Sequence, residues 1–178
     1  MPLAVTHFVI TVIIFTLIRD YFIKNNKKFP IHYVFIGGLA GLLPDIDFAF
    51  YLILSFFGFT YDQLHRTFTH NIFFPLIFVI LARITKNIRS FKIGNKIFHY
   101  STLFLVIAGG IFIHLVLDAT VGGYIFPFYP FNNFIFGLNL PDYLPDNIRG
   151  VFFPILDAVF LILWISYLEY RHKISSFF

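Results

Sequence analysis

Five long apolar stretches constrain the fold of this chain more than any other feature of its sequence. A helix that spans a bilayer needs about 20 mostly apolar residues, or about 17 at the shortest. Hydrophobic residues make up 58% of the 178 residues, well above their share in soluble domains. We therefore expect an all-α, polytopic membrane helical bundle that forms one membrane-embedded domain over residues 1–178. The apolar stretches cover residues 3–18, 31–57, 71–84, 97–117 and 151–168.

The second stretch is too long for one simple span, and it contains Pro44. Proline has no backbone N–H, and it disfavours the helical conformation in the residue before it. We expect a helix over residues 31–43, a break at residues 43–47 and a further apolar helix through residue 57. Non-helical backbone at membrane depth is tolerated only where protein encloses it or where it lines a cavity. The break therefore predicts an enclosed site.

The basic residues predict the orientation of the bundle. Cytoplasmic loops carry an excess of Lys and Arg, and most basic residues here follow the first, third and fifth stretches. We expect an integral protein of the plasma membrane with a cytoplasmic C-terminus, and with the N-terminus and residues 58–70 and 118–150 outside. The basic residues are spread between stretches and form no single face, which argues against a nucleic-acid partner. They are Arg19, Lys24, Lys27, Lys28, Arg83, Lys86, Arg89, Lys92, Lys96, Arg171 and Lys173.

Seven histidines and aspartates lie inside or beside the apolar stretches, although only 12% of the chain is charged. Ionisable groups are costly to place in a membrane, and those that occur there commonly mark functional sites. The predicted topology brings these residues from four segments to one layer near the outer face. Since the chain has no cysteine, a metal in this layer would need nitrogen and oxygen ligands. The candidate metal ligands are His7, Asp45, Asp47, His65, His70, His114 and Asp118.

The local spacings differ in how strongly they indicate a metal. His114 and Asp118 are four residues apart and share one helix face, so they can hold one ion or two adjacent ions, or simply hydrogen-bond to each other. Asp45 and Asp47 follow a proline among apolar residues, where two carboxylates repel unless a cation lies between them or one is protonated. A solvated pair at a helix start is the alternative. His7 taken alone fits an interior histidine with a hydrogen-bond partner.

His65 and His70 are five residues apart, which suits a turn better than a continuous helix. We expect Thr69 to cap the helix that follows. Arg66 lies between the two histidines and could bind the oxygens of a phosphate. Four histidines and three aspartates fit the ligand set of two adjacent divalent ions with open positions, as used in phosphoester hydrolysis.

Four motifs follow one another along the chain: Thr6-His7, Gly-Leu-Leu-Pro-Asp45-Ile-Asp47, His65-Arg66-Thr67-Phe68-Thr69-His70-Asn71, and Gly110 through His114-Leu-Val-Leu-Asp118. With the later Phe126-Pro127-Phe128 they cover about residues 6–130. The set resembles the YdjM-like family of predicted membrane-bound metal-dependent hydrolases. That family is similar in turn to zinc-dependent phospholipase C and the single-strand-specific zinc nucleases, which are helical enzymes that cleave phosphoesters with clustered zinc ions.

The resemblance implies which residues bind metal, and one departure from it limits the expected number of ions. The implied ligands are His7, one or both of Asp45 and Asp47, His65 or His70, His114 and Asp118. The soluble zinc enzymes supply a further His-x-x-x-Glu helix, whereas this chain has only Glu169, with no histidine four residues before it. We therefore expect one or two divalent ions, with zinc favoured.

Together these features predict a membrane-bound metal-dependent hydrolase that cleaves a phosphoester of a lipid or polyprenyl substrate with a metal-activated water at the extracytoplasmic interface. In this hypothesis Arg66 stabilises the developing negative charge, and Asp45 or Asp47 orients the water or takes its proton. Membrane lipid and a phosphorylated lipid substrate are the expected partners. The alternatives are a divalent metal-ion transporter and a non-catalytic membrane interaction protein whose polar cluster only holds helices together.

Overall fold

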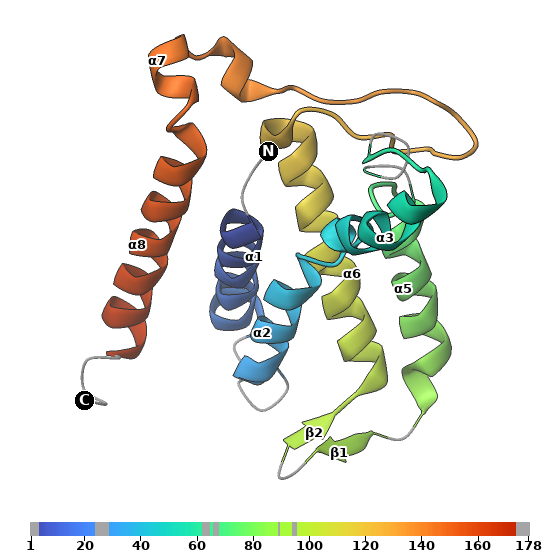
Figure 1. Cartoon of the computed structure of the whole chain (residues 1–178). Coiled ribbons are helices and arrows are strands. Elements are labelled where there is room, and N and C mark those ends of the chain that lie inside the picture. Colours follow the sequence, from blue (N-terminus) through green and yellow to red (C-terminus); the bar gives the residue numbers. More distant parts are fainter. Residues whose placement is uncertain are drawn as a thin grey trace.

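The protein is a helical bundle with one small β-hairpin (Figure 1). The computed structural model describes residues 4–23, 29–61, 65, 68–88, 90–93 and 96–173. The long elements are α1 (Ala4–Leu17) with its π-helical continuation η1 (Ile18–Ile23), α2 (Ile31–Ala40), α3 (Asp47–Leu54), α5 (Phe73–Ile84), α6 (Tyr100–Leu117) with its π-helical continuation η5 (Asp118–Gly122), and α8 (Phe152–His172). The short ones are η2 (Pro44–Ile46), η3 (Ser55–Phe57), η4 (Thr85–Asn87), β1 (Phe91–Ile93), β2 (Lys96–Phe98), η6 (Leu140–Tyr143) and α7 (Asp146–Arg149).

The prediction of an all-α membrane bundle is confirmed, and the helices refine the number of spans. Within the described residues, three helices are long and apolar enough to cross a membrane: Ala4–Ile23, Tyr100–Gly122 and Phe152–His172. The bent pair of α2 and the helical segment Pro44–Phe57 makes a fourth candidate. The third apolar stretch forms only α5, whose 12 residues extend over about 18 Å. It is therefore shorter than the hydrocarbon core of a bilayer, which is about 30 Å thick.

The break predicted around Pro44 is present. Helix α2 ends at Ala40, a turn follows, and the chain resumes at η2 and α3 with a bend of 46°. Pro44 stands at the start of η2, where its missing N–H costs no helical hydrogen bond. As a result, α3 lies across the front of the bundle instead of continuing along α2 (Figure 1).

Small residues let α2 approach α6 very closely. A Cβ atom added to Gly110 of α6 would lie 2.5 Å from the carbonyl oxygen of Gly37 and 3.0 Å from the amide nitrogen of Gly41. On the other side of α2, Gly37 and Gly38 pack against Phe15 and Val12 of α1. The core below the break is apolar, with Val12, Phe15, Tyr33, Val34 and Val106 buried in one cluster. Helices α1 and α6, which carry polar residues of the predicted layer, are thus held at fixed separations from α2, which leads into the break.

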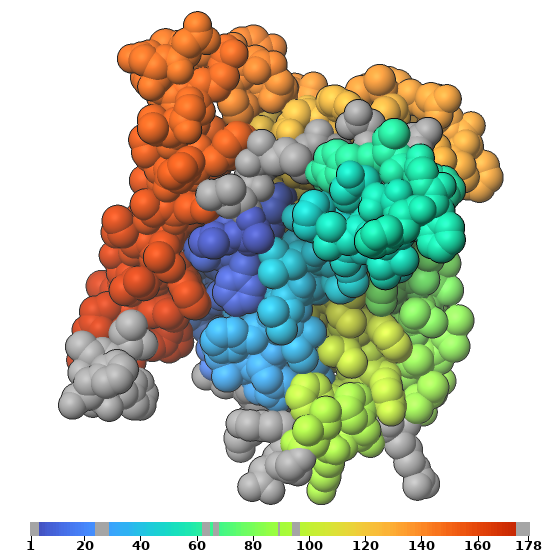
Figure 2. All heavy atoms as spheres, in the orientation of Figure 1, coloured from blue at the N-terminus to red at the C-terminus, as the bar shows by residue number. Residues whose placement is uncertain are grey.

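Helix α8 stands at the edge of the bundle and packs mainly on α1 (Figures 1 and 2). Polar contacts join these helices near both ends. Near one end, the Thr6 hydroxyl donates a hydrogen bond to Asp157. Near the other end, Asp20 of η1 accepts a hydrogen bond from the Tyr167 hydroxyl at 2.8 Å and lies 3.0 Å from Nε2 of His172.

Candidate metal centre

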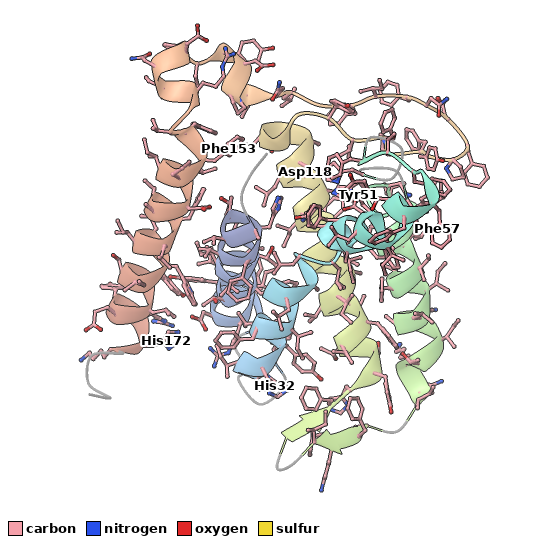
Figure 3. All side chains as sticks on the ribbon, in the orientation of Figure 1. His32, Tyr51, Phe57, Asp118, Phe153 and His172 are labelled. Atoms are coloured by element: carbon pink, nitrogen blue, oxygen red, sulfur yellow. The ribbon has the colours of Figure 1, made fainter. Side chains whose placement is uncertain are left out.

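Five of the predicted ligands converge at one end of the bundle. They come from four segments: His7 from α1, Asp45 from η2, His70 from the turn before α5, and His114 and Asp118 from α6 and the start of η5. His7, His70, His114 and Asp118 are almost wholly buried, whereas one third of the Asp45 side chain is exposed. Asp118 lies near one end of the bundle, and His32 and His172 lie at the other end (Figure 3). The cluster is therefore closed on most sides and accessible beside Asp45.

Four side-chain atoms lie close together in this cluster, as two triangles that share the Nε2 atoms of His70 and His114. Nε2 of His70 lies 3.2 Å from Nε2 of His114 and 3.3 Å from Oδ2 of Asp118. Nε2 of His114 lies 3.5 Å from the same carboxylate oxygen. Oδ1 of Asp45 lies 3.6 Å from each of the two imidazole nitrogens.

These separations match those between the ligands of a tetrahedral metal site. Zinc binds imidazole nitrogen and carboxylate oxygen at about 2.0–2.2 Å, so neighbouring ligands of a tetrahedral ion lie about 3.3–3.6 Å apart. Two imidazoles and two carboxylates also form a donor set that suits a divalent ion. The cluster therefore has both the spacing and the chemistry of a metal centre.

The backbone at the helix break orients His114. Nδ1 of His114 lies 2.7 Å from the carbonyl oxygen of Gly41, so Nδ1 carries the proton and donates this hydrogen bond. In the neutral imidazole this tautomer leaves Nε2 as the nitrogen that can bind a metal, as in most metal-binding histidines. The contact depends on the close approach of α2 and α6 at Gly110. The sequence motifs did not identify this role of the Gly41 carbonyl. The break at Pro44 was a signal for it, because the last carbonyls of a helix lack helical partners and are open to other donors.

Asp47 lies one layer behind the cluster. Its Oδ2 atom is 3.3 Å from Nδ1 of His70, and this nitrogen faces away from the four central atoms. Nδ1 of His65 lies 3.1 Å from the same carboxylate oxygen, and the Thr69 hydroxyl donates to it at 3.4 Å. Asp47 and His65 thus stand where a carboxylate commonly orients a metal-binding histidine. Within the described residues, neither belongs to a group with ligand spacing.

His7 forms a second possible group with His114 and Asp118. Its ring stacks on that of His114 with centroids 3.9 Å apart, and its Nε2 atom lies 3.5 Å from Oδ1 of Asp118. Nδ1 of His114 is already bonded to Gly41, so His114 offers only Nε2 as a ligand. The two groups therefore compete for this one nitrogen.

The cluster also contains buried polar atoms that a cation would satisfy. Among the described residues, both carboxylate oxygens of Asp118 and Nδ1 of His7 are buried without a hydrogen-bond partner. Burial lowers the pKa of His70, but the carboxylates of Asp118, Asp45 and Asp47 beside its ring outweigh this effect and raise the pKa to about 10. Carboxylates so buried are costly unless a positive charge accompanies them, and a proton on His70 supplies that charge when no metal does. The residues present therefore fit a divalent ion.

Two other predictions concern the segment between α3 and α5. Arg66, the predicted phosphate-binding residue, lies outside the described residues. Thr69 does not cap α5. Instead, the side-chain oxygen of Asn71 accepts hydrogen bonds from the amides of Phe73 and Phe74 at 3.0 and 3.1 Å. Since the Thr69 hydroxyl contacts Asp47, Asn71 takes its place at the helix start.

Comparison with known proteins shows the family of the chain. The sequence profile of the family described as "YdjM inner membrane protein" matches residues 1–177. The chain belongs to this family. The resemblance inferred from the four motifs is confirmed, and this member of the YdjM family is an integral membrane protein whose buried His and Asp residues could hold a metal ion. No curated protein and no solved structure gives a significant match to the chain.

Proposed function

We propose that this YdjM family member is a membrane-bound metal-dependent hydrolase that cleaves phosphoesters. The observation that carries the proposal is the buried triangle of Nε2 of His70, Nε2 of His114 and Oδ2 of Asp118 at ligand spacing, with Oδ1 of the partly exposed Asp45 3.6 Å from both nitrogens. A divalent ion in this position supplies Lewis acidity, the main requirement for attack on a phosphorus centre near neutral pH.

The residues around the ion divide into those that hold it and those that orient the holders. His70, His114 and Asp118 hold the ion from the buried side, and Gly41 and Asp47 orient the two imidazoles through Nδ1. Asp45 has the only partly exposed side chain of the cluster, so it faces an entering substrate and is the carboxylate best placed to accept a proton. Arg66 keeps its proposed role as the cation that binds the anionic substrate.

One ion fits the cluster better than two. His70, His114 and Asp118 would supply three ligands to it and would leave the fourth tetrahedral position, beside Asp45, open for water or substrate, as in catalytic zinc sites. Because His114 has one free nitrogen, a second ion would have His7 and Oδ1 of Asp118 as ligands from the described residues. Zinc is the proposed ion because this mixture of imidazole and carboxylate donors is typical of zinc sites.

A lipid substrate is favoured by the surroundings of Asp45. Asp45 leads through η2 into α3, whose large apolar side chains are about half exposed or more, including Phe48, Phe50 and Ile53. A water-soluble substrate would gain nothing from this surface, whereas a lipid or polyprenyl phosphoester could approach along it. The cluster lies at the end of α5 opposite Arg83, so the positive-inside rule favours an extracytoplasmic site and a cytoplasmic C-terminus.

The transporter alternative has less support. A transporter of divalent ions needs ligands that continue across the membrane. In the described part of the chain, both groups with ligand spacing include His114 and lie at one end of the bundle. The remaining histidines lie near the opposite end: His32 contacts the rings of Tyr33 and Phe98, His172 pairs with Asp20, and His99 is exposed at the start of α6.

Metal analysis combined with an activity screen tests the proposal directly. Protein purified in detergent should contain about one zinc ion per chain by elemental analysis, and it should hydrolyse phosphorylated lipids in a reaction that a chelator stops and added zinc restores. A soluble phosphomonoester and a soluble phosphodiester complete the screen. Protein that contains far less than one divalent ion per chain and hydrolyses none of these compounds would refute the proposal.

Replacing Asp47 by asparagine tests its orienting role. The Asp47→Asn variant keeps the shape of the side chain but removes the charge that holds the Nδ1 proton of His70. Loss of such a partner typically lowers metal affinity about 10–100-fold. Competition with a zinc-binding dye measures this affinity. Asp146→Asn, at a side chain that is 96% exposed, serves as the control and should bind zinc as the wild type does. An Asp47→Asn protein with wild-type affinity would exclude this role.

A further inference from the structure

A chain of cavities runs between α5 and α6, separate from the metal centre. A cavity of about 150 Å³ lies at the end near the metal centre and shares Ile72 and Phe112 with a second one of about 310 Å³. The second cavity shares Val79 and Leu105 with a third one of about 280 Å³ at the far end. Adjacent cavities that share walls form one groove along the two helices.

The sequence spacing shows that the groove follows one face of each helix. On the α5 side the lining residues include Ile72, Leu76, Val79, Arg83 and Lys86, and on α6 and η5 they include Ser101, Leu105, Ala108, Phe112, Leu115 and Ala119. Steps of three and four residues keep side chains on the same helix face. From Ser101 to Ala119 the groove extends over about 27 Å, which approaches the thickness of the hydrocarbon core of a bilayer.

The two ends of the groove differ in charge. The first two cavities are lined by apolar residues, together with Thr120 at the end near the metal centre. The third has Arg83, Lys86 and the half-buried Ser101 in its wall. No carboxylate of the described residues lies within ion-pair distance of Arg83 or Lys86. A long apolar channel that ends at two cations matches the chemistry of an anionic amphiphile.

We propose that the α5–α6 groove binds an anionic phospholipid. The phosphate of the headgroup contacts Arg83 and Lys86, and an acyl chain lies in the cavity between Leu76 and Phe112. Lys and Arg near the membrane surface attract anionic lipids. The apolar walls of the groove pack against the acyl chain. The site is independent of the proposed hydrolase, because the headgroup lies at the end of α5 opposite His70.

Native mass spectrometry on the full-length protein tests this site with phosphatidylglycerol as the probe and phosphatidylcholine as the neutral comparison. The wild type should retain phosphatidylglycerol in clear excess. The double variant Arg83→Gln with Lys86→Gln should lose affinity for it about tenfold to thirtyfold, as expected when two basic residues are removed. Val79→Trp, which fills the point where two cavities meet, should reduce the retention of both lipids.

Lys92→Gln serves as the matched control, because Lys92 is an exposed cation of β1 that does not line the groove. It should retain phosphatidylglycerol as the wild type does. Equal retention by the double variant and the wild type would overturn the proposal. An equal loss in Lys92→Gln would overturn it too, since it would show attraction to net charge alone. Free glycerol phosphate should not displace the lipid. Displacement would show that the phosphate accounts for binding and that the apolar part of the groove contributes nothing.

Discussion

Replacing His114 by alanine is expected to remove the metal from the protein and to abolish hydrolysis. His114 belongs to both groups with ligand spacing, so its loss leaves neither group with three ligands. Loss of a residue that only orients a ligand already lowers affinity about 10–100-fold, and loss of the ligand itself should exceed this. Elemental analysis of the purified variant and titration with a zinc-binding dye measure the effect.

The same variant distinguishes a metal centre from a polar cluster that only stabilises the bundle. For a metal centre, His114→Ala should elute as a monodisperse protein with wild-type helix content but without zinc. For a purely stabilising cluster, it should aggregate or unfold, and the wild type should contain no metal. His99→Ala, at an exposed histidine at the start of α6, is the control and should retain zinc. Retention of one zinc per chain by His114→Ala would contradict the proposed ligand set.

Replacing Gly110 by alanine is expected to destabilise the bundle and to weaken metal binding together. The new Cβ atom would lie 2.5 Å from the Gly37 carbonyl oxygen and 2.8 Å from Cβ of Ala40, so α2 and α6 must move apart. Overpacking of this kind costs about 1–3 kcal/mol. The separation also draws the Gly41 carbonyl away from Nδ1 of His114, which releases the imidazole from its metal-binding orientation.

Thermal unfolding in detergent, with and without zinc, measures both effects of Gly110→Ala. The midpoint should fall in the absence of zinc, and the gain in midpoint upon adding zinc should be smaller than for the wild type, because a ligand stabilises according to its affinity. Gly150→Ala is the control, since a Cβ atom there meets nothing within 4 Å. A Gly110→Ala protein with wild-type midpoints in both conditions would show that the helices do not cross this closely.

Much of the fold was predictable because the bilayer allows few structures. Apolar stretches of spanning length must be helical, and the break at Pro44 follows from the missing N–H of proline. The spacing of His114 and Asp118 also predicted their contact, since a continuous helix directs residues four apart to one face. The third stretch, residues 71–84, was already short for a span, in agreement with the short α5. The small hairpin before α6 lay beyond the hydropathy pattern, because that pattern carries no information about local loop structure.

The roles within the two pairs, Asp45 with Asp47 and His65 with His70, were not predictable. Each pair has identical side chains a few residues apart, and both members are plausible ligands by type. The structure brings Asp45 and His70 to the central atoms and puts Asp47 behind His70, in contact with His65. Thr69 was the predicted cap of α5, but Asn71 caps the helix instead, because the Thr69 hydroxyl donates a hydrogen bond to Asp47.

The sequence alone determined that this chain is a membrane helical bundle, that its second apolar stretch is broken, and that its buried histidines and aspartates belong to one layer. Only the tertiary structure decided which side-chain atoms come within metal-ligand spacing of one another and which residues lie behind them. Helical periodicity fixes the direction of a side chain along one segment, but metal binding depends on distances of a few tenths of an ångström between segments far apart in the chain. The close packing of α2 on α6 at Gly110 sets those distances, and no local pattern encodes them.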